Sequence, residues 1–324
     1  MSLFVRKSLA SLLLEANESG NKTLKRVLGP WSLVALGVGV IIGAGLFSIT
    51  GAVAAGYTGP AITLSFIVAA LGCCFAALCY AEFASMIPVA GSAYTYSYAT
   101  MGELIAWIIG WDLVLEYCVA ATTVSISWSR YLVVFLEGFG VQLPQALTAC
   151  PWDGGIVNIP AFLIVALMSI FLIRGTEGSS IFNGIIVFLK VSVVLTFVAL
   201  GWQYIRMENY MPYIPANTGT LGEFGLSGIL RGAAIVFFAF LGFDAVSTAA
   251  QETKNPKRGM PIGILMSLGI TTILYMLFAH VMTGVVHYSS FSGQAGIAPV
   301  AIAIDHMGTM GADGVIHPDY PWLN

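Results

Sequence analysis

The stretch LGVGVIIGAGLFSITGAVA, residues 36–54, is apolar enough to cross a bilayer, yet Gly43 and Gly45 flank Ala44 near its middle. Glycine is a weak helix former because it loses the most backbone freedom when it is ordered. In hydrocarbon, an unwound backbone is tolerated only where protein or a water-filled cavity satisfies its N–H and C=O groups. The stretch therefore predicts an interrupted helix that borders a cavity or, as the plainer alternative, glycines that let two helices pack closely.

The composition of the whole chain predicts an all-α multi-pass membrane protein. Of its 324 residues, 58% are hydrophobic and 9% are charged, whereas soluble domains are about half apolar and about a quarter charged. The net charge of −3 is small and dispersed, which argues against a nucleic-acid partner. Four of the five cysteines fall inside apolar runs without disulfide or zinc spacing, so we expect no cofactor and no metal.

Seven apolar runs of about the length that spans a bilayer occur along the chain. They cover residues 31–54, 60–85, 103–135, 159–173, 181–205, 227–250 and 260–287. Residues 1–30 precede the first run and read as a cytoplasmic N-terminal segment, because acidic residues interrupt their apolar stretch and no cleaved signal peptide is indicated.

Lysine and arginine indicate how the spans are threaded. Basic residues cluster before the first span, after the fourth and after the sixth, whereas the loops on the opposite side offer only Arg206. The clusters consist of Arg6, Lys7, Lys22, Lys25, Arg26, Arg174, Lys254, Lys257 and Arg258. Because positive charge stays on the cytoplasmic side, the N-terminus is predicted to lie in the cytoplasm of a cell-membrane protein, with the end of the chain outside.

A second interrupted span is predicted in RGAAIVFFAFLGFDAVST, residues 231–248, where Gly242 lies near mid-membrane. An acid at the bilayer centre costs roughly 2.5–3.5 kcal/mol on insertion scales, so Asp244 needs a structural reason, and we expect it to cap the half-helix after the break. Two glycine-broken spans in corresponding positions of two halves indicate a secondary transporter with inverted repeats and a midplane site. Here the broken spans are the first and the sixth, which implies repeats of five.

Four stretches carry a resemblance to a known family: GVGVIIGAGLFSITG, YAEFASMIPVAGSAYTYSYATMGELIAWIIGWDLVLEY, FNGIIVFLKVSVVL and FFAFLGFDAVSTAAQETKNPKRGMPIGI. They resemble the amino acid–polyamine–organocation transporters, in the cationic amino acid transporter branch. The resemblance implies a LeuT-like fold of two inverted five-helix repeats. Residues 31–205 would form the first repeat and residues 206–324 an incomplete second one, because spans eight to ten are absent and the chain reads as a fragment.

The carboxylate of an amino acid suits the first break. Freed amides of Gly43, Ala44 and Gly45 would face it at the positive end of the second half-helix, and glycine leaves the main chain open to close approach. The resemblance implies the same carboxylate site.

For the ammonium group, the resemblance implies the backbone carbonyls of Ile41, Phe238 and Leu241. Unwound carbonyls and helix C-terminal ends attract cations, which makes this arrangement physically reasonable.

Among the charged side chains within the predicted spans, two are candidates for function. Lys190 lies in the fifth span, where the resemblance to proton-coupled relatives implies a lysine with a proton-coupling role. The alternative is a structural cation that holds spans one and five together. Glu116 in the third span could receive a cationic side chain, orient polar groups beneath the site or pair with Lys190. The predicted function is secondary active, proton-coupled amino acid transport by alternating access, with amino acid, protons and the lipid bilayer as partners.

Other classes of membrane protein fit the sequence less well. A seven-helix receptor or retinal protein matches the span count, but that class has its N-terminus outside and a retinal lysine on the last span. An enzyme is not expected, because the four histidines form no HExxH pair and no serine–histidine spacing suggests a nucleophile. A channel remains an alternative, although broken helices with opposed half-dipoles favour an occluded binding site.

Overall fold

The computed structural model describes residues 5–8, 10–12, 14, 26–173, 179–293, 298–310 and 316–319. Its α-helices are α2 (Pro30–Ile41), α3 (Thr50–Val53), α4 (Ile62–Met86), α5 (Ser92–Thr100), α6 (Glu103–Gly138), α7 (Ile159–Ile173), α8 (Ser179–Gly201), α9 (Gly225–Val236), α10 (Pro256–Val285) and α11 (Pro299–Asp305). A short antiparallel hairpin pairs β1 (Gly308–Met310) with β2 (Ile316–Pro318). The predicted all-α class is confirmed, with this hairpin as the one departure among the described residues.

Each of the seven predicted spans coincides with helical segments, interrupted in the first and the sixth, but only five stretches of the described chain are long and apolar enough to cross a membrane. These stretches are Gly45–Met86, Glu103–Gly138, Gly184–Tyr204, Gly225–Glu252 and Pro256–Val285. The count differs from seven for two reasons. The first predicted span is cut after Ile41, which leaves α2 with 12 residues, and the fourth, α7, has only 15. Of the predicted basic clusters, Lys22, Lys25 and Arg174 lie outside the described residues.

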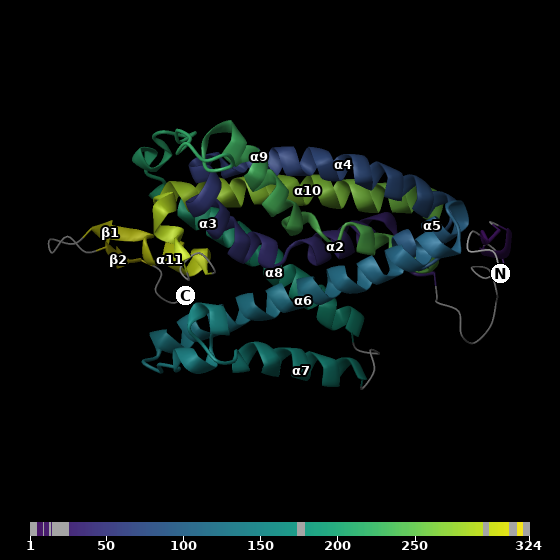
Figure 1. The fold of residues 1–324 in the computed structure, drawn as a ribbon, viewed down its shortest axis with the longest axis horizontal. Helices are drawn as coiled ribbons and strands as arrows, with labels where there is room; N and C mark the ends of the chain where they lie inside the picture. The colour runs from purple at the N-terminus through teal and green to yellow at the C-terminus, as the bar shows by residue number, and fades with distance from the viewer. Residues whose placement is uncertain are drawn as a thin grey trace.

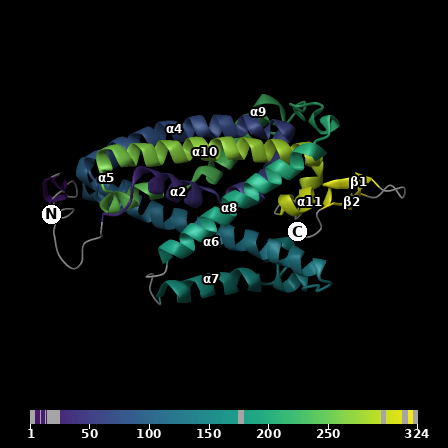
Figure 2. The same cartoon turned by 180° about the vertical axis from the view of Figure 1, so that it is seen from behind.

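Helices α4 and α10 run side by side along the length of the molecule, and α2 lies against α10 (Figure 1). Small residues let α2 and α10 approach closely, as is usual between helices in membranes. A side chain at Gly37 of α2 would collide with Ser267, and one at Gly263 of α10 would collide with Leu33. Seen from behind, α8 crosses diagonally in front of α6 and reaches one end of α10 (Figure 2), and it packs on α10 and α2.

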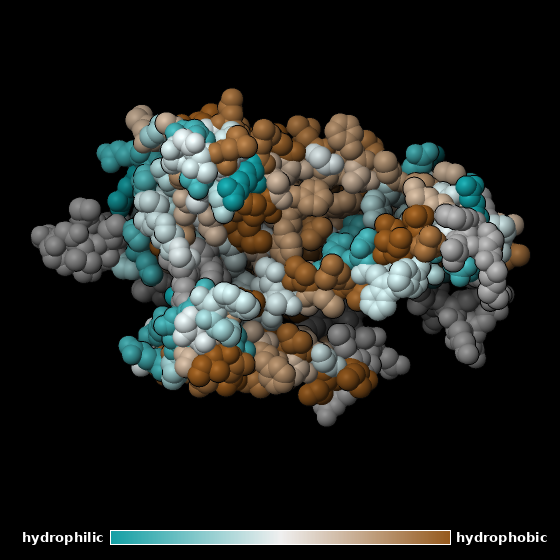
Figure 3. All heavy atoms as spheres, in the orientation of Figure 1, coloured by the Kyte–Doolittle hydropathy of each residue, from teal (hydrophilic) through white to brown (hydrophobic). Residues whose placement is uncertain are grey.

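Helix α6 is the longest helix described and packs on α5 and α7. Many of its large apolar side chains are exposed, Trp107 and Leu115 among them, and so is Phe162 on α7. In water such a surface would be costly, whereas hydrocarbon is a good solvent for it. The space-filling view agrees, because hydrophobic residues dominate the middle of the molecule and hydrophilic ones gather towards its two ends (Figure 3).

Two short helices lie in the segments that connect the spans. Helix α5 forms within the polar and aromatic segment between spans two and three, and α11 forms within APVAIAIDHMG, residues 298–308. They lie at opposite ends of the molecule, with the hairpin at the α11 end (Figure 1).

Candidate substrate site at two interrupted spans

The first span is interrupted where the sequence predicts it. Helix α2 ends at Ile41, Ile42 takes an extended conformation (φ −69°, ψ 109°), and the helical path resumes as the π-helix η1, Gly45–Ile49. The N–H groups of Gly43, Ala44 and Gly45 donate no backbone hydrogen bond to the described part of the chain. Three unpaired amides therefore stand at the start of the second half-helix, where the helix dipole favours an anion.

The two glycines of this break have different surroundings. A Cβ atom built on Gly43 would meet only the Ile41 carbonyl oxygen, 4.0 Å away, so Gly43 borders open space. A Cβ atom on Gly45 would collide with the backbone of Ala239 in the sixth span. Gly45 thus follows the plainer alternative of close packing, and Gly43 leaves the main chain accessible.

The sixth span is also interrupted where predicted. The 3₁₀-helix η8, Phe237–Phe240, is followed by Leu241 and Gly242 and then by a second 3₁₀-helix, η9, Asp244–Glu252. Gly242 has a φ of +109°, which side chains rarely adopt, and its Cα faces Val40 of α2. Because Gly45 also packs on Ala239, the two breaks lie directly against each other.

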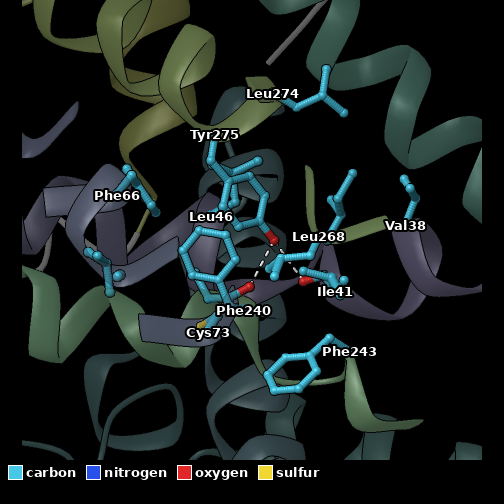
Figure 4. Close-up of a cluster of buried hydrophobic side chains, with 14 of the residues drawn as sticks. Val38, Ile41, Leu46, Phe66, Cys73, Phe240, Phe243, Leu268, Leu274 and Tyr275 are labelled. Carbon is cyan, nitrogen blue, oxygen red and sulfur yellow. Dashed lines mark hydrogen bonds between the residues drawn. The ribbon is translucent and has the colours of Figure 1, made fainter. Parts of the chain in front are cut away.

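Tyr275 of α10 fastens the two broken spans together. Its hydroxyl lies 2.8 Å from the Ile41 carbonyl oxygen and 2.9 Å from the Ala239 carbonyl oxygen, and the side chain is completely buried. The ring packs against those of Phe66 and Phe240, with centroids 5.4 and 5.3 Å away, and Figure 4 shows the hydroxyl reaching towards Ile41. The carbonyl of Ile41, a predicted ammonium ligand, therefore already accepts a hydrogen bond, although a carbonyl oxygen has a second lone pair.

Lys190 of α8 reaches the same break from the other side. Its ammonium donates to the carbonyl oxygens of Gly39, at 3.2 Å, and Ile42, at 3.1 Å. These bonds join spans one and five, as the structural alternative requires. They are made to carbonyl oxygens rather than to the carboxylate of Glu116, so the pairing of Lys190 with Glu116 is absent from the described residues.

The sequence predicted that Asp244 caps the half-helix after the second break, and this prediction was wrong. The residue at the cap position is Phe243, and no side chain there accepts a hydrogen bond from the helix. The buried Asp244 carboxylate instead accepts hydrogen bonds from the hydroxyls of Ser92, at 3.3 Å, and Tyr117, at 3.4 Å. Two long-range hydroxyl donors satisfy the acid better than a 3₁₀ turn can, and they tie span six to α5 and to span three.

Glu116 is half-buried on α6, next to Tyr117, and its carboxylate repels that of Asp244. Tyr96, on the adjacent α5, stacks on Phe83 with ring centroids 5.2 Å apart. Burial raises the pKa of the Tyr96 phenol to about 12, so this hydroxyl keeps its proton at neutral pH.

The comparison with known proteins agrees with this geometry. A family model described as amino acid permease matches residues 28–316. The chain belongs to the amino acid permease family. The branched-chain amino acid permease BcaP of Bacillus subtilis (strain 168) is 47% identical over 319 residues, which are 97% of this chain and 66% of that protein.

Other members of the permease family are named for different substrates. The methylthioribose transporter of Bacillus subtilis (strain 168) is 43% identical over 317 residues, 97% of this chain and 66% of that protein. The cationic amino acid transporter 4 of Homo sapiens is 37% identical over 280 residues, 85% of this chain and 43% of that protein. The chain thus spans 66% of the length of the two bacterial relatives, and membership of this family places it among transport proteins rather than enzymes.

Three long-range contacts around the breaks were not predicted from the sequence. They involve Tyr275, Ser92 and Tyr117, which are uncharged and lie far along the chain from the backbone or carboxylate that they bind. A search for charges within spans finds Lys190 and Asp244 but passes over hydroxyls. The useful signal was the orphaned backbone itself, since every carbonyl freed by a break needs a donor in hydrocarbon.

Proposed function

We propose that the intact protein is a secondary active amino acid transporter that uses proton coupling and alternating access. The substrate carboxylate binds the free amides of Gly43, Ala44 and Gly45. Its ammonium binds three backbone carbonyls at the ends of the broken helices, those of Ile41, Phe238 and Leu241. The Ile41 and Phe238 carbonyls already accept one hydrogen bond each, so they would use their second lone pairs. The observation that carries the proposal is the set of unpaired amides beside open space at Gly43.

The proposed architecture places residues 31–205 in one five-helix repeat and residues 206–324 in the first part of an inverted second repeat. The α5 end of the molecule faces the cytoplasm of a cell membrane. Lys190 is the proposed proton-coupling group, because its ammonium donates to two carbonyls of the broken span one and loss of its proton would weaken both hydrogen bonds. Glu116 lies beneath the site and contributes negative charge on the path to the cytoplasm.

Uptake by the full-length protein in proteoliposomes tests the function. Radiolabelled leucine and lysine are offered with an inward proton gradient, with no gradient, and with the gradient collapsed by a protonophore. We expect saturable uptake of an amino acid that the gradient accelerates. Large unsaturable ion current would support a channel instead, and the absence of any gradient effect would contradict proton coupling.

A second substrate class belongs in the same assay, because one relative is named as a methylthioribose transporter and is 43% identical. Methylthioribose has no carboxylate, so it cannot use free amides as an anion site. Uptake of methylthioribose without uptake of any amino acid would overturn the proposed substrate site.

A further inference from the structure

The half-helix that follows the first break is bonded to the long helix α6. The Tyr131 hydroxyl of α6 donates to the Phe47 carbonyl oxygen of η1 at 2.6 Å. The Ser127 hydroxyl of α6 is hydrogen-bonded to that of Ser48, the next residue of η1, and both serines are buried. Two adjacent residues of broken span one therefore each bond to a hydroxyl of span three.

The spacing of the two α6 residues places both hydroxyls on one face of that helix. Ser127 and Tyr131 are four residues apart, so they lie one turn from each other. Gly45, at the start of η1, is in tight contact with Ala239 of span six. The second half of span one is thus fixed by packing against span six and by hydrogen bonds to span three.

The bonded turn adjoins the free amides of the proposed carboxylate site. The N–H groups of Leu46 and Phe47 both donate to the Gly43 carbonyl oxygen, at 3.1 and 3.3 Å. The residue whose carbonyl accepts from Tyr131 is therefore itself bonded back to Gly43, where the unpaired amides begin. A change in the position of η1 would change the position of these amides.

We propose that Ser127 and Tyr131 are positioning residues for the substrate carboxylate, which act through η1 by holding the amides of residues 43–45 towards the open space at Gly43. Backbone amides cannot turn individually as side chains do. An anion site built from them therefore depends on the half-helix that carries them being held in place. The proposal rests on the proposed function, because that function assigns the carboxylate to this break.

The first experiment follows amide hydrogen exchange of residues 42–49 by mass spectrometry, in the full-length protein in lipid nanodiscs and without substrate. Tyr131→Phe and Ser127→Ala each remove one hydroxyl that bonds η1. We expect each to speed exchange in this segment about threefold to 20-fold, which is the loss of one interhelical hydrogen bond in a membrane expressed as a ratio. Ser129→Ala is the matched control and should leave this exchange unchanged, because the buried Ser129 hydroxyl of α6 donates to Asn158, at 2.7 Å, and not to span one.

The second experiment measures ligand binding to the same variants. Radiolabelled leucine or lysine, whichever the parent binds, is displaced by the unlabelled amino acid or by its decarboxylated amine, 3-methylbutylamine or cadaverine. Tyr131→Phe and Ser127→Ala should weaken amino acid binding about threefold to 20-fold and leave amine binding unchanged, because misplaced amides affect only the carboxylate. Ser48→Ala removes the other half of the same hydroxyl pair, so combining it with Ser127→Ala should weaken binding little more than either change alone.

Two results would overturn the positioning role. One is exchange that is equally fast in Ser129→Ala and in the two test variants, or that is no faster than in the parent in all three. The other is equal weakening of amino acid and amine binding, which is what a general structural defect would cause. A parent that binds neither amino acid would refute the proposed function instead, and the exchange measurements would still decide whether α6 holds η1.

Discussion

Replacement of Gly43 by valine should abolish amino acid binding while leaving the fold intact. The backbone at Gly43 is not among those with a positive φ, and a Cβ atom there meets nothing nearer than the Ile41 carbonyl oxygen at 4.0 Å. The Cβ atom of a valine therefore fits without strain. Its methyl groups would, however, stand over the amides of residues 43–45 and keep a carboxylate away.

The size of the effect follows from the hydrogen bonds lost. A hydrogen bond to a charged group contributes about 1.5–3 kcal/mol, and each 1.4 kcal/mol changes a dissociation constant tenfold. Loss of a single amide contact thus weakens binding about tenfold to 150-fold, and loss of two or three removes measurable binding. Radioligand binding to the purified full-length protein, together with its thermal unfolding midpoint, measures both quantities.

Gly45→Ala is the contrasting control, because its Cβ would collide with the backbone of Ala239. It should lower the unfolding midpoint, whereas Gly43→Val should not. An unchanged dissociation constant in Gly43→Val would refute the idea that the free amides bind the substrate. A large drop in its unfolding midpoint would refute the claim that Gly43 borders open space.

Three further substitutions test the contacts around the breaks. Lys190→Ala should remove the pH dependence of uptake and keep some amino acid binding, and uptake that depends on pH as in the parent would contradict the coupling role. Tyr275→Phe should lower the free energy of unfolding by about 1 kcal/mol, within the range measured for interhelical hydrogen bonds in membranes, as read by denaturant titration in detergent; no change would mean that its two carbonyls find other donors. Gly242→Ala should lower the free energy of unfolding by about 1–2 kcal/mol from its φ of +109° alone. Adding Val40→Ala to this variant should relieve only the steric contact with Val40. If the double variant regained the full stability of the parent, the positive φ would not be the cause.

The sequence was sufficient to predict the helical class, the approximate spans and both interruptions, because these depend on composition and on glycine, which act locally. Gly242 illustrates this: its φ is positive, and glycine is the residue that adopts such a φ most readily, so a glycine within an apolar run marks a position where the helix can break. The role predicted for Asp244 was wrong because capping considers only neighbouring residues in the sequence. The carboxylate instead accepts hydrogen bonds from Ser92 and Tyr117, which are distant in the sequence. Such long-range donors leave no spacing in the sequence from which they could be inferred.

The distribution of satisfied groups at the first break indicates the kind of ligand that the break serves. Helix α2 ends with orphaned carbonyls, and the protein provides donors for three of them: Lys190 for Gly39 and Ile42, and Tyr275 for Ile41. The amides that follow have no such acceptors. If the break were only structural, both sets would need partners, because each unpaired group is costly in hydrocarbon. Donors for three of the carbonyls beside free amides are therefore the arrangement expected if the break binds an anion, which on the proposed function is the carboxylate common to all amino acids.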